Sequence, residues 1–235
     1  MSINNRTKFL SMSGIRNRNK NAECEDVIFI DEESSIKFYG LADGQTKKLF
    51  CKEGGIETLK TVFKYISDKG ISQIIQSEYI DEIKYEIMTL IRKSITDLSI
   101  IRGTDKTEFA STLVVFSYDI KTGEYIAIHI GDGGIVENNP KGEINIISPP
   151  ENGLSLNYTW LTTSSDALFH LRICFGNIKT CNRIVMFTDG TEICRGKNIS
   201  ERIKKLICSE NSNDIIDYIK QINPIDDASC IVLDF

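Results

Sequence analysis

The sequence has few of the residues that bind zinc or build a disulfide framework. It contains only two histidines, His129 and His170, in 235 residues. Its seven cysteines are an odd number and none of them forms a C-x-x-C pair, so neither a zinc site nor a set of disulfides is expected. We expect reduced, mostly buried thiols in a cytoplasmic protein.

Several longer patterns are also missing. No run of about 20 apolar residues and no signal-peptide pattern occurs, so we expect no membrane partner. The formal net charge is −5, and no basic stretch of the kind that binds nucleic acid is present. Because no repeat, low-complexity tract or Pro/Gly-rich linker divides the chain, we expect one domain over residues 1–235.

The apolar periodicity predicts alternating groups of strands and helices. Residues 52 to about 101 carry apolar positions at helical spacing in two blocks, and two shorter helices are predicted at 199–208 and 214–222. The segment 149–181 is rich in Ser, Thr and Asn and is expected to form loops, with a short helix capped by Ser164 or Ser165. Strands are predicted at 26–30, 36–41, 111–118, 124–130, 135–137, 144–147, 183–188 and 228–235.

This order of elements favours an α+β architecture over alternating βαβ units. Strands are followed by a helix pair, then strands, a second helix pair and a last strand. We expect a central antiparallel β-sandwich of two sheets face to face, with a helix pair on each outer side.

Three Asp-Gly pairs each close an apolar run: FYGLADG (38–44), YIAIHIGDGG (125–134) and RIVMFTDG (183–190). A single Asp-Gly pair is most often a turn, because glycine accepts positive φ. However, the stretches YGLA and MFT are continuously apolar or small, which is typical of strands buried on both faces. Asp43, Asp132 and Asp189 would then lie at the rim of a core, where a carboxylate needs a partner.

A fourth acidic pair, Asp226-Asp227, precedes the last apolar run, ASCIVLDF. Carboxylates from distant parts of one chain indicate a hard cation, which prefers oxygen ligands. Two such ions bridged by one carboxylate lower the pKa of a water between them and bind a phosphoryl group.

Six segments, in order, resemble the motifs of the metal-dependent protein phosphatases (the PPM or type 2C family), most of all its compact bacterial branch. Each motif is short, but six in the right order make a specific signal that runs nearly from end to end. The fold implied, a β-sandwich flanked by helices, agrees with the order of elements. The segments are NAECEDVIFI (21–30), GLADGQ (40–45), FASTLVVF (109–116), IAIHIGDGGIV (126–136), RIVMFTDGTEI (183–193) and DDASCIVL (226–233).

The resemblance implies Mg²⁺ or Mn²⁺ as cofactor, with two ions or three. Asp43 would bridge two ions, and the Gly44 carbonyl would bind one of them. Asp189 and Asp226 would hold the first ion and Glu25 the second. Water activated by both ions would attack phosphorus in line, without a phosphoenzyme.

Further roles follow from the same resemblance. Asp26 would lie behind Glu25, and Asp132 would form a third metal position with Asp189. An arginine before the first acidic motif would bind the substrate phosphate, since a guanidinium donates two parallel hydrogen bonds. Arg16 is the first candidate and Arg18 the second.

The chain departs from the family pattern after Gly44, where Gln45-Thr46-Lys47-Lys48 replaces a glycine-rich run. No histidine acid stands nearby, and the two lysines are expected to be solvated charges. Where some members carry another acidic ligand this chain has Ile193, and Glu192 is the possible substitute.

The sequence therefore predicts a metal-dependent phosphatase that acts on phosphoserine or phosphothreonine of a protein substrate. A Ser/Thr kinase is a candidate partner, by resemblance. The alternative is a catalytically impaired type 2C-like binding or regulatory module. Another dinuclear hydrolase, such as a nuclease, fits less well because histidine ligands and a basic groove are lacking.

Overall fold

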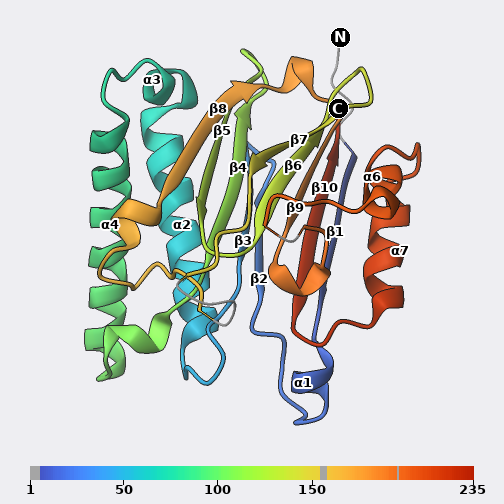
Figure 1. Ribbon diagram of the computed structural model, residues 1–235. Helices are drawn as coiled ribbons and strands as arrows, with labels where there is room; N and C mark the ends of the chain where they lie inside the picture. Colours follow the sequence, from blue (N-terminus) through green and yellow to red (C-terminus); the bar gives the residue numbers. More distant parts are fainter. Residues whose placement is uncertain (1–5, 154–157, 195) are drawn as a thin grey trace.

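Two antiparallel sheets packed face to face form the centre of the protein, and helices cover both outer faces (Figure 1). The computed structural model describes residues 6–153, 158–194 and 196–235. The predicted α+β sandwich with a helix pair on each side is confirmed.

One of the two sheets, called sheet B, is built from strands in the middle of the chain. Its order is β2-β3-β4-β5-β8, and every neighbouring pair is antiparallel. β4 is buried along almost its whole length, as expected for a strand covered on both faces. The strands are β2 (Val27–Asp31), β3 (Ile36–Ala42), β4 (Leu113–Asp119), β5 (Glu124–Ile130) and β8 (Arg172–Asn177).

The second sheet, sheet A, joins the two ends of the described chain. Its order is β1-β10-β9-β6-β7, and all neighbouring pairs are again antiparallel. β1 pairs with β10 so that Leu10 lies opposite Cys230. The strands are β1 (Arg6–Met12), β6 (Gly134–Asn138), β7 (Ile144–Ser148), β9 (Arg183–Phe187) and β10 (Ala228–Asp234).

The longer helices divide between the two sheets (Figure 1). The pair α2 and α4 packs on sheet B together with α3, and α6 and α7 pack on sheet A. Among the described residues, no helix is both long and apolar enough to cross a membrane. The helices are α1 (Ile15–Arg18), α2 (Cys51–Lys69), α3 (Ile71–Ile75), α4 (Ile80–Arg102), α5 (Ala167–His170), α6 (Glu201–Ile207) and α7 (Asn213–Ile222), with 3₁₀ turns η1 (Lys106–Phe109), η2 (Ile178–Thr180) and η3 (Asp189–Thr191).

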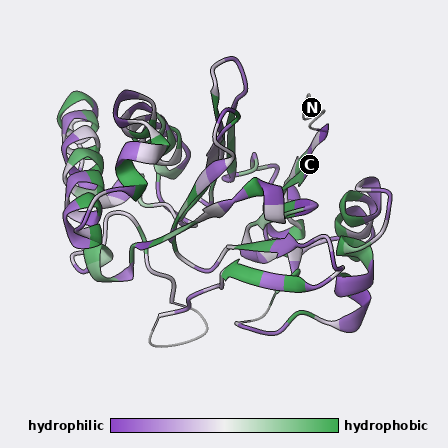
Figure 2. Ribbon diagram, turned by 90° about the horizontal axis from the view of Figure 1, so that it is seen from above, coloured by the Kyte–Doolittle hydropathy of each residue, from purple (hydrophilic) through white to green (hydrophobic). Residues whose placement is uncertain are grey.

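Three apolar layers hold these elements together. The layer between the sheets includes the fully buried side chains of Tyr39, Phe116 and Met186. The outer layers lie beneath the helix pairs, and hydrophilic and hydrophobic residues alternate around those helices (Figure 2). The opposed sheets therefore form a rigid frame whose strand ends can position side chains.

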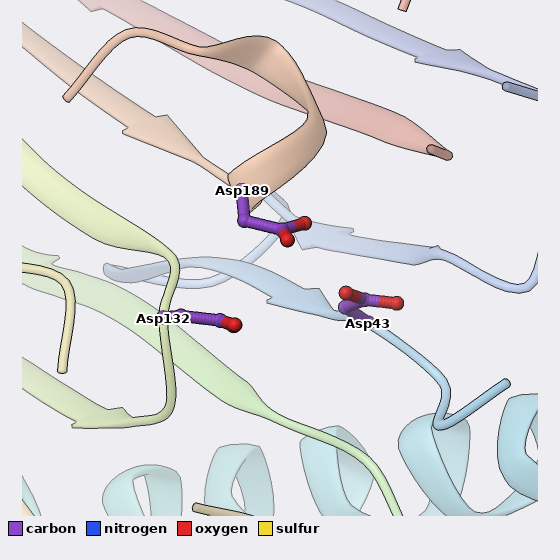
Figure 3. Close-up of side chains that lie close together, drawn as sticks. All are labelled: Asp43, Asp132 and Asp189. Atoms are coloured by element: carbon purple, nitrogen blue, oxygen red, sulfur yellow. The ribbon is translucent and has the colours of Figure 1, made fainter. Parts of the chain in front are cut away.

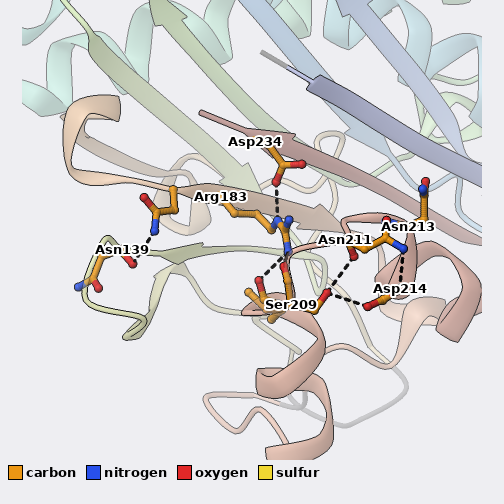
Figure 4. Close-up of polar contacts among 9 residues, drawn as sticks. Asn139, Arg183, Ser209, Asn211, Asn213, Asp214 and Asp234 are labelled. Carbon is orange, nitrogen blue, oxygen red and sulfur yellow. Dashed lines mark hydrogen bonds and ion pairs between the residues drawn. The ribbon is translucent and has the colours of Figure 1, made fainter. Parts of the chain in front are cut away.

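A buried arginine ties sheet A to the end of α6 (Figure 4). The Arg183 Nε donates to Asp234 Oδ1 on β10 at 2.5 Å. Its Nη1 donates to the carbonyl oxygens of Ile207 and Ser209, both at 2.8 Å. Carbonyls at the end of a helix lack intrahelical partners, so the guanidinium satisfies groups that would otherwise be unpaired.

Among the strands and α-helices, four elements were not predicted, namely β1, α1, α3 and β8. The predicted cap of the short helix was also wrong. α5 begins at Ala167 after Asp166 and has no side-chain cap, while the Ser164 hydroxyl instead accepts from the Leu161 N–H at 3.2 Å. All seven cysteines are free and four of them are buried, in agreement with the predicted reduced thiols.

Candidate metal centre

Three aspartates from distant parts of the sequence converge at one end of the sandwich (Figure 3). Asp43 follows β3, Asp132 follows β5, and Asp189 begins η3 directly after β9. One carboxylate oxygen from each lies within 4.8 Å of those of the other two. The structure therefore brings together the three Asp-Gly pairs identified in the sequence.

Hydrogen bonds fix the first two of these aspartates. The Asp43 N–H donates to the Thr112 hydroxyl at 2.9 Å, and the Thr112 N–H donates back to the Asp43 carbonyl at 2.9 Å. Asp132 Oδ2 accepts from the Thr159 hydroxyl, which belongs to the loop between β7 and β8. A neighbouring segment thus holds Asp43 through its backbone and Asp132 through its carboxylate.

Glycine after the aspartate permits close packing at two of these positions. A Cβ on Gly44 would lie 2.8 Å from Cys51 Sγ and 2.9 Å from the Glu25 carbonyl oxygen. A Cβ on Gly190 would lie 2.1 Å from the Asp227 carbonyl oxygen. The segments that carry Glu25 and Asp227 can therefore approach the cluster only because these positions lack side chains.

The carboxylates lie close enough together to raise one another's pKa values. Burial, followed by the charges of Asp26 and Asp189, raises the pKa of Asp43 well above its usual value. Desolvation by the surrounding protein, followed by the charges of Asp132 and Asp226, raises the pKa of Asp189 to about 7. The residue is nevertheless exposed to solvent on the side of the cavity. Burial also raises the pKa of Asp132, while the hydrogen bond from Thr159 opposes the shift. A cation would relieve this repulsion.

Asp26 is a buried carboxylate next to the cluster. Its Oδ2 accepts from the Thr188 hydroxyl at 2.9 Å, but its Oδ1 has no hydrogen-bond partner among the described residues. Burial raises the pKa of Asp26 to about 6. An unpartnered carboxylate oxygen beside Asp43 suits a site that gains a cation or its water ligands.

The cluster lies in a cavity of about 1210 Å³. Asp226 lines the same cavity but forms an ion pair with Arg16, whose Nη1 lies 2.8 Å from Asp226 Oδ2. Both side chains are substantially exposed to solvent, at 63% for Arg16 and 39% for Asp226. Arg18, the second candidate for phosphate binding, instead donates to Asn223 Oδ1 at 2.5 Å.

Glu25 lies beside this cavity and is not among the described residues that line it. Its N–H donates to Asp227 Oδ2 at 2.6 Å. The same carboxylate accepts from the Gly14 N–H at 2.8 Å and from Asn17 Nδ2 at 2.9 Å. Asp227 therefore fixes the segment that carries Arg16 and Glu25, a role that the sequence analysis missed although the acidic pair was noted.

Thr159 was also missed, and aromatic packing explains how its loop is held. The His170 ring stacks on Trp160 with centroids 3.7 Å apart, and its Nδ1 lies 2.9 Å from Glu151 Oε1. His129 is fully buried on β5, where burial and the charge of Arg172 lower its pKa well below the usual value. His129 is thus a packed side chain, and its Nδ1 lies 2.8 Å from Ser148 Oγ.

The donor set suits a hard divalent cation. Every side chain in the cluster offers carboxylate oxygen, the ligand that Mg²⁺ and Mn²⁺ prefer, and no described histidine or cysteine belongs to it. Hydroxyl groups and the side chains of Arg16, Lys47 and Lys106 also line the cavity. A cavity lined by both carboxylates and cationic side chains can hold metal ions and an anionic ester together.

Comparison with known proteins gives a consistent result. A family model described as protein phosphatase 2C matches residues 13–223. A search of curated proteins finds none that matches the sequence.

Solved structures with the same fold include PppA, described as a key regulatory component of T6SS in Pseudomonas aeruginosa. It has a TM-score of 0.70 and 11% identity, over 98% of this chain and 97% of that one. RsbX in complex with magnesium gives 0.65 and 12%, over 100% and 96%. The serine/threonine phosphatase Stp1 from Staphylococcus aureus gives 0.66 and 11%, over 98% and 94%. At such identities the likeness shows the fold.

Proposed function

Because the chain belongs to the protein phosphatase 2C family, we propose that it hydrolyses phosphoserine or phosphothreonine on proteins with the help of Mg²⁺ or Mn²⁺. The observation that carries this proposal is the convergence of Asp43, Asp132 and Asp189 within 4.8 Å in one cavity. Stp1 is described as a serine/threonine phosphatase and RsbX was solved with magnesium, which supports the choice of reaction and cofactor.

The proposed ligands are those that the sequence predicts. Asp43 and Asp189 face each other across the sheets, Asp132 lies beside them, and Asp226 lines the same cavity. The Gly44 carbonyl and Glu25, with Asp26 behind it, complete the proposed set for two ions or three. When bound there, divalent ions lower the pKa of water and neutralise phosphoryl oxygens.

The protein's own groups position the substrate and the ligands. Arg16 pairs with Asp226 and lines the same cavity as the three aspartates, so its guanidinium can donate to a phosphate oxygen there. Thr112 holds Asp43 from both sides of its peptide, and Asp227 holds the segment of Arg16 and Glu25. We propose that these contacts preorganise the site before substrate binds.

The test measures hydrolysis of para-nitrophenyl phosphate and of a phosphothreonine peptide with Mn²⁺, with and without chelator. We expect Asp43→Asn to reduce turnover by roughly a hundredfold or more, on the order of the loss when one strong electrostatic group leaves an active site. The matched control is Asp217→Asn, an exposed carboxylate on α7 paired with Lys220. Turnover that survives both chelator and Asp43→Asn would refute the proposal.

The ion pair between Arg16 and Asp226 favours a second candidate, a catalytically impaired module that binds phosphoproteins. In this pair the proposed phosphate-binding residue, Arg16, is bound to a proposed metal ligand, Asp226, so the contact competes with both proposed roles. Calorimetry with Mn²⁺, together with the turnover assay, distinguishes the two candidates. An enzyme binds the ion and turns over substrate, whereas a module of this kind binds a phosphopeptide but neither binds the ion nor turns over substrate. Phosphoproteins, including a Ser/Thr kinase that modifies them, are the proposed partners in both cases.

A further inference from the structure

A second, smaller pocket adjoins the cavity of the candidate metal centre. It has a volume of about 290 Å³, well above the roughly 30 Å³ that one water occupies in the liquid. Lys106, Thr163, Ser164 and Ser165 line both this side pocket and the main cavity, so the two spaces adjoin along these residues. An extended ligand such as a peptide can therefore place neighbouring groups in both.

The side pocket and the main cavity differ in charge. Four aspartates and four basic side chains line the main cavity, while the lining of the side pocket contains the cations Arg92 and Lys106 and no carboxylate. The remaining lining is hydroxyl-rich, with Ile91 and Ile95 of α4 as its apolar part. Cationic and hydroxyl donors around an apolar base suit a single anionic group on a short carbon chain.

Both cations line the side pocket, and a hydrogen bond orients one of them. Arg92 Nη2 donates to the Ser165 carbonyl at 3.0 Å, which orients the guanidinium and leaves its other N–H groups for a ligand. The nearby carboxylates already face partners. Asp105 accepts from the Thr107 N–H at 2.8 Å, and Asp166 lies 3.9 Å from His170 Nε2.

The backbone opposite α4 is also fixed. Both the N–H and the hydroxyl of Thr162 donate to the Ser111 carbonyl, at 2.9 and 3.1 Å. The segment of Ser164 and Ser165 therefore starts from an anchored point, and the pocket keeps its shape between this segment and α4.

We propose that the side pocket is an anion subsite, which binds a carboxylate or a second phosphate that the phosphoprotein substrate carries near the phosphorylated residue in the main cavity. This inference rests on the proposed function, because it assumes that a phosphorylated residue occupies the main cavity. The substrate class is then an acidic or doubly phosphorylated segment. Arg92 and Lys106 are specificity-determining residues of that subsite.

The experiment uses fluorescein-labelled peptides with a phosphonate analogue of phosphothreonine, which lacks the scissile P–O bond. In the reference peptide the flanking residues are neutral. Each of the other peptides carries a single glutamate or a single phosphoserine, placed at one of the positions up to three residues away on either side. Fluorescence anisotropy with Mn²⁺ present measures the affinity. We expect about fivefold tighter binding for one added anion, the scale of a solvent-accessible ion pair, and only on one side of the phosphonate.

Arg92→Ala and Lys106→Ala should each remove most of that preference. Lys106→Ala forms a second test, because Arg92 also holds the Ser165 carbonyl and its loss could disturb folding. The control is Lys93→Ala, the next residue of α4, which lines a different groove and removes the same charge. The glutamate and phosphoserine arms show which anion is preferred.

Two results would overturn the subsite: equal affinity for neutral and anionic peptides, or an equal loss of preference in Lys93→Ala. Turnover of para-nitrophenyl phosphate distinguishes this failure from that of the proposed function. A chain that keeps the preference but hydrolyses nothing rejects the phosphatase and retains the subsite. A protein that hydrolyses para-nitrophenyl phosphate but binds neutral and anionic peptides equally well retains the phosphatase and rejects the subsite.

Discussion

The carboxylate of Asp227 accepts hydrogen bonds from three donors on the segment before β2, namely Gly14, Asn17 and Glu25. The residue is 3% exposed, so water cannot replace these bonds. We expect Asp227→Ala to lower the free energy of unfolding by about 3 kcal/mol, since buried donors left unpaired cost about 1–3 kcal/mol each. Urea denaturation measures this loss.

The matched substitution Asp217→Ala, at an exposed site, should change stability by less than about 0.5 kcal/mol. An Asp227→Ala protein as stable as that control would show that the three hydrogen bonds contribute little.

Thr159 donates to Asp132 and belongs to a different loop. We expect Thr159→Val to weaken Mn²⁺ binding by about tenfold, the lower end of the usual effect when a partner of a metal ligand is lost. Thr159→Ser keeps the hydroxyl and should restore the affinity. Titration calorimetry with Mn²⁺ measures both variants, and an unchanged affinity in Thr159→Val would mean that the hydroxyl does not position Asp132.

The continuously apolar stretches before Asp43 and Asp189 predicted that these carboxylates lie at the rim of the core, and the resemblance to the type 2C motifs added Asp132 to the same site. Their roles as ligands stay predictions. Thr159 and Asp227 could not be found in the same way. Their partners lie 27 residues away for Thr159 and 202 or more for Asp227, and a threonine in a polar loop has no distinctive pattern.

Among the elements, β9 and β10 depend on Arg183, which joins them to the end of α6. We expect Arg183→Leu to lower the free energy of unfolding by about 3 kcal/mol, because Asp234 and two carbonyl oxygens lose their donor. Lys205→Leu, at an exposed position of α6, is the control and should stay within about 0.5 kcal/mol. Urea denaturation measures both.

Mn²⁺ affinity should be unchanged in Arg183→Leu. Arg183 and Asp189 are separated by the length of β9, roughly 20 Å at 3.3 Å per residue. A loss of metal binding equal to that of Asp43→Asn would show that the defect is not local.

The central elements were predicted and the missed strands lie at the edges. β4 and β9 are continuously buried and β-branched or apolar, so their sequences are unambiguous. β1 and β8 are edge strands, and their side chains are exposed or half-buried. An edge strand needs fewer apolar residues, and its pairing is decided by a neighbour distant in the sequence. α1 has only four residues and no side-chain cap.

For the whole molecule, the crowded carboxylates predict an unusual pH dependence. Asp26 and Asp189 have pKa values of about 6 and about 7, above the roughly 3.9 of an unfolded aspartate. Between about pH 4 and pH 7 the folded metal-free protein therefore binds more protons than the unfolded chain. Its free energy of unfolding should rise as the pH falls through this window.

We expect the metal-free protein, with chelator present, to melt at a higher temperature at pH 5.5 than at pH 7.5. Asp189→Asn should raise the melting temperature at pH 7.5 by about 2–4 °C, corresponding to on the order of 1 kcal/mol once solvent screening is allowed for. Mn²⁺ at a hundred times its dissociation constant should stabilise the native protein by about 2.7 kcal/mol at pH 7.5. A melting temperature that falls on acidification in chelator, equally in both proteins, would contradict the assigned protonation.

The pairing of β1 with β10 has a consequence for synthesis on the ribosome. Sheet B uses residues 27–177 alone and can assemble while later residues are still being added. β1, by contrast, finds its only described strand neighbour near residue 230, so this early segment must wait without its partner. Asp226 directly precedes β10, and the acidic pocket is therefore completed only after all strands of sheet B have been synthesised.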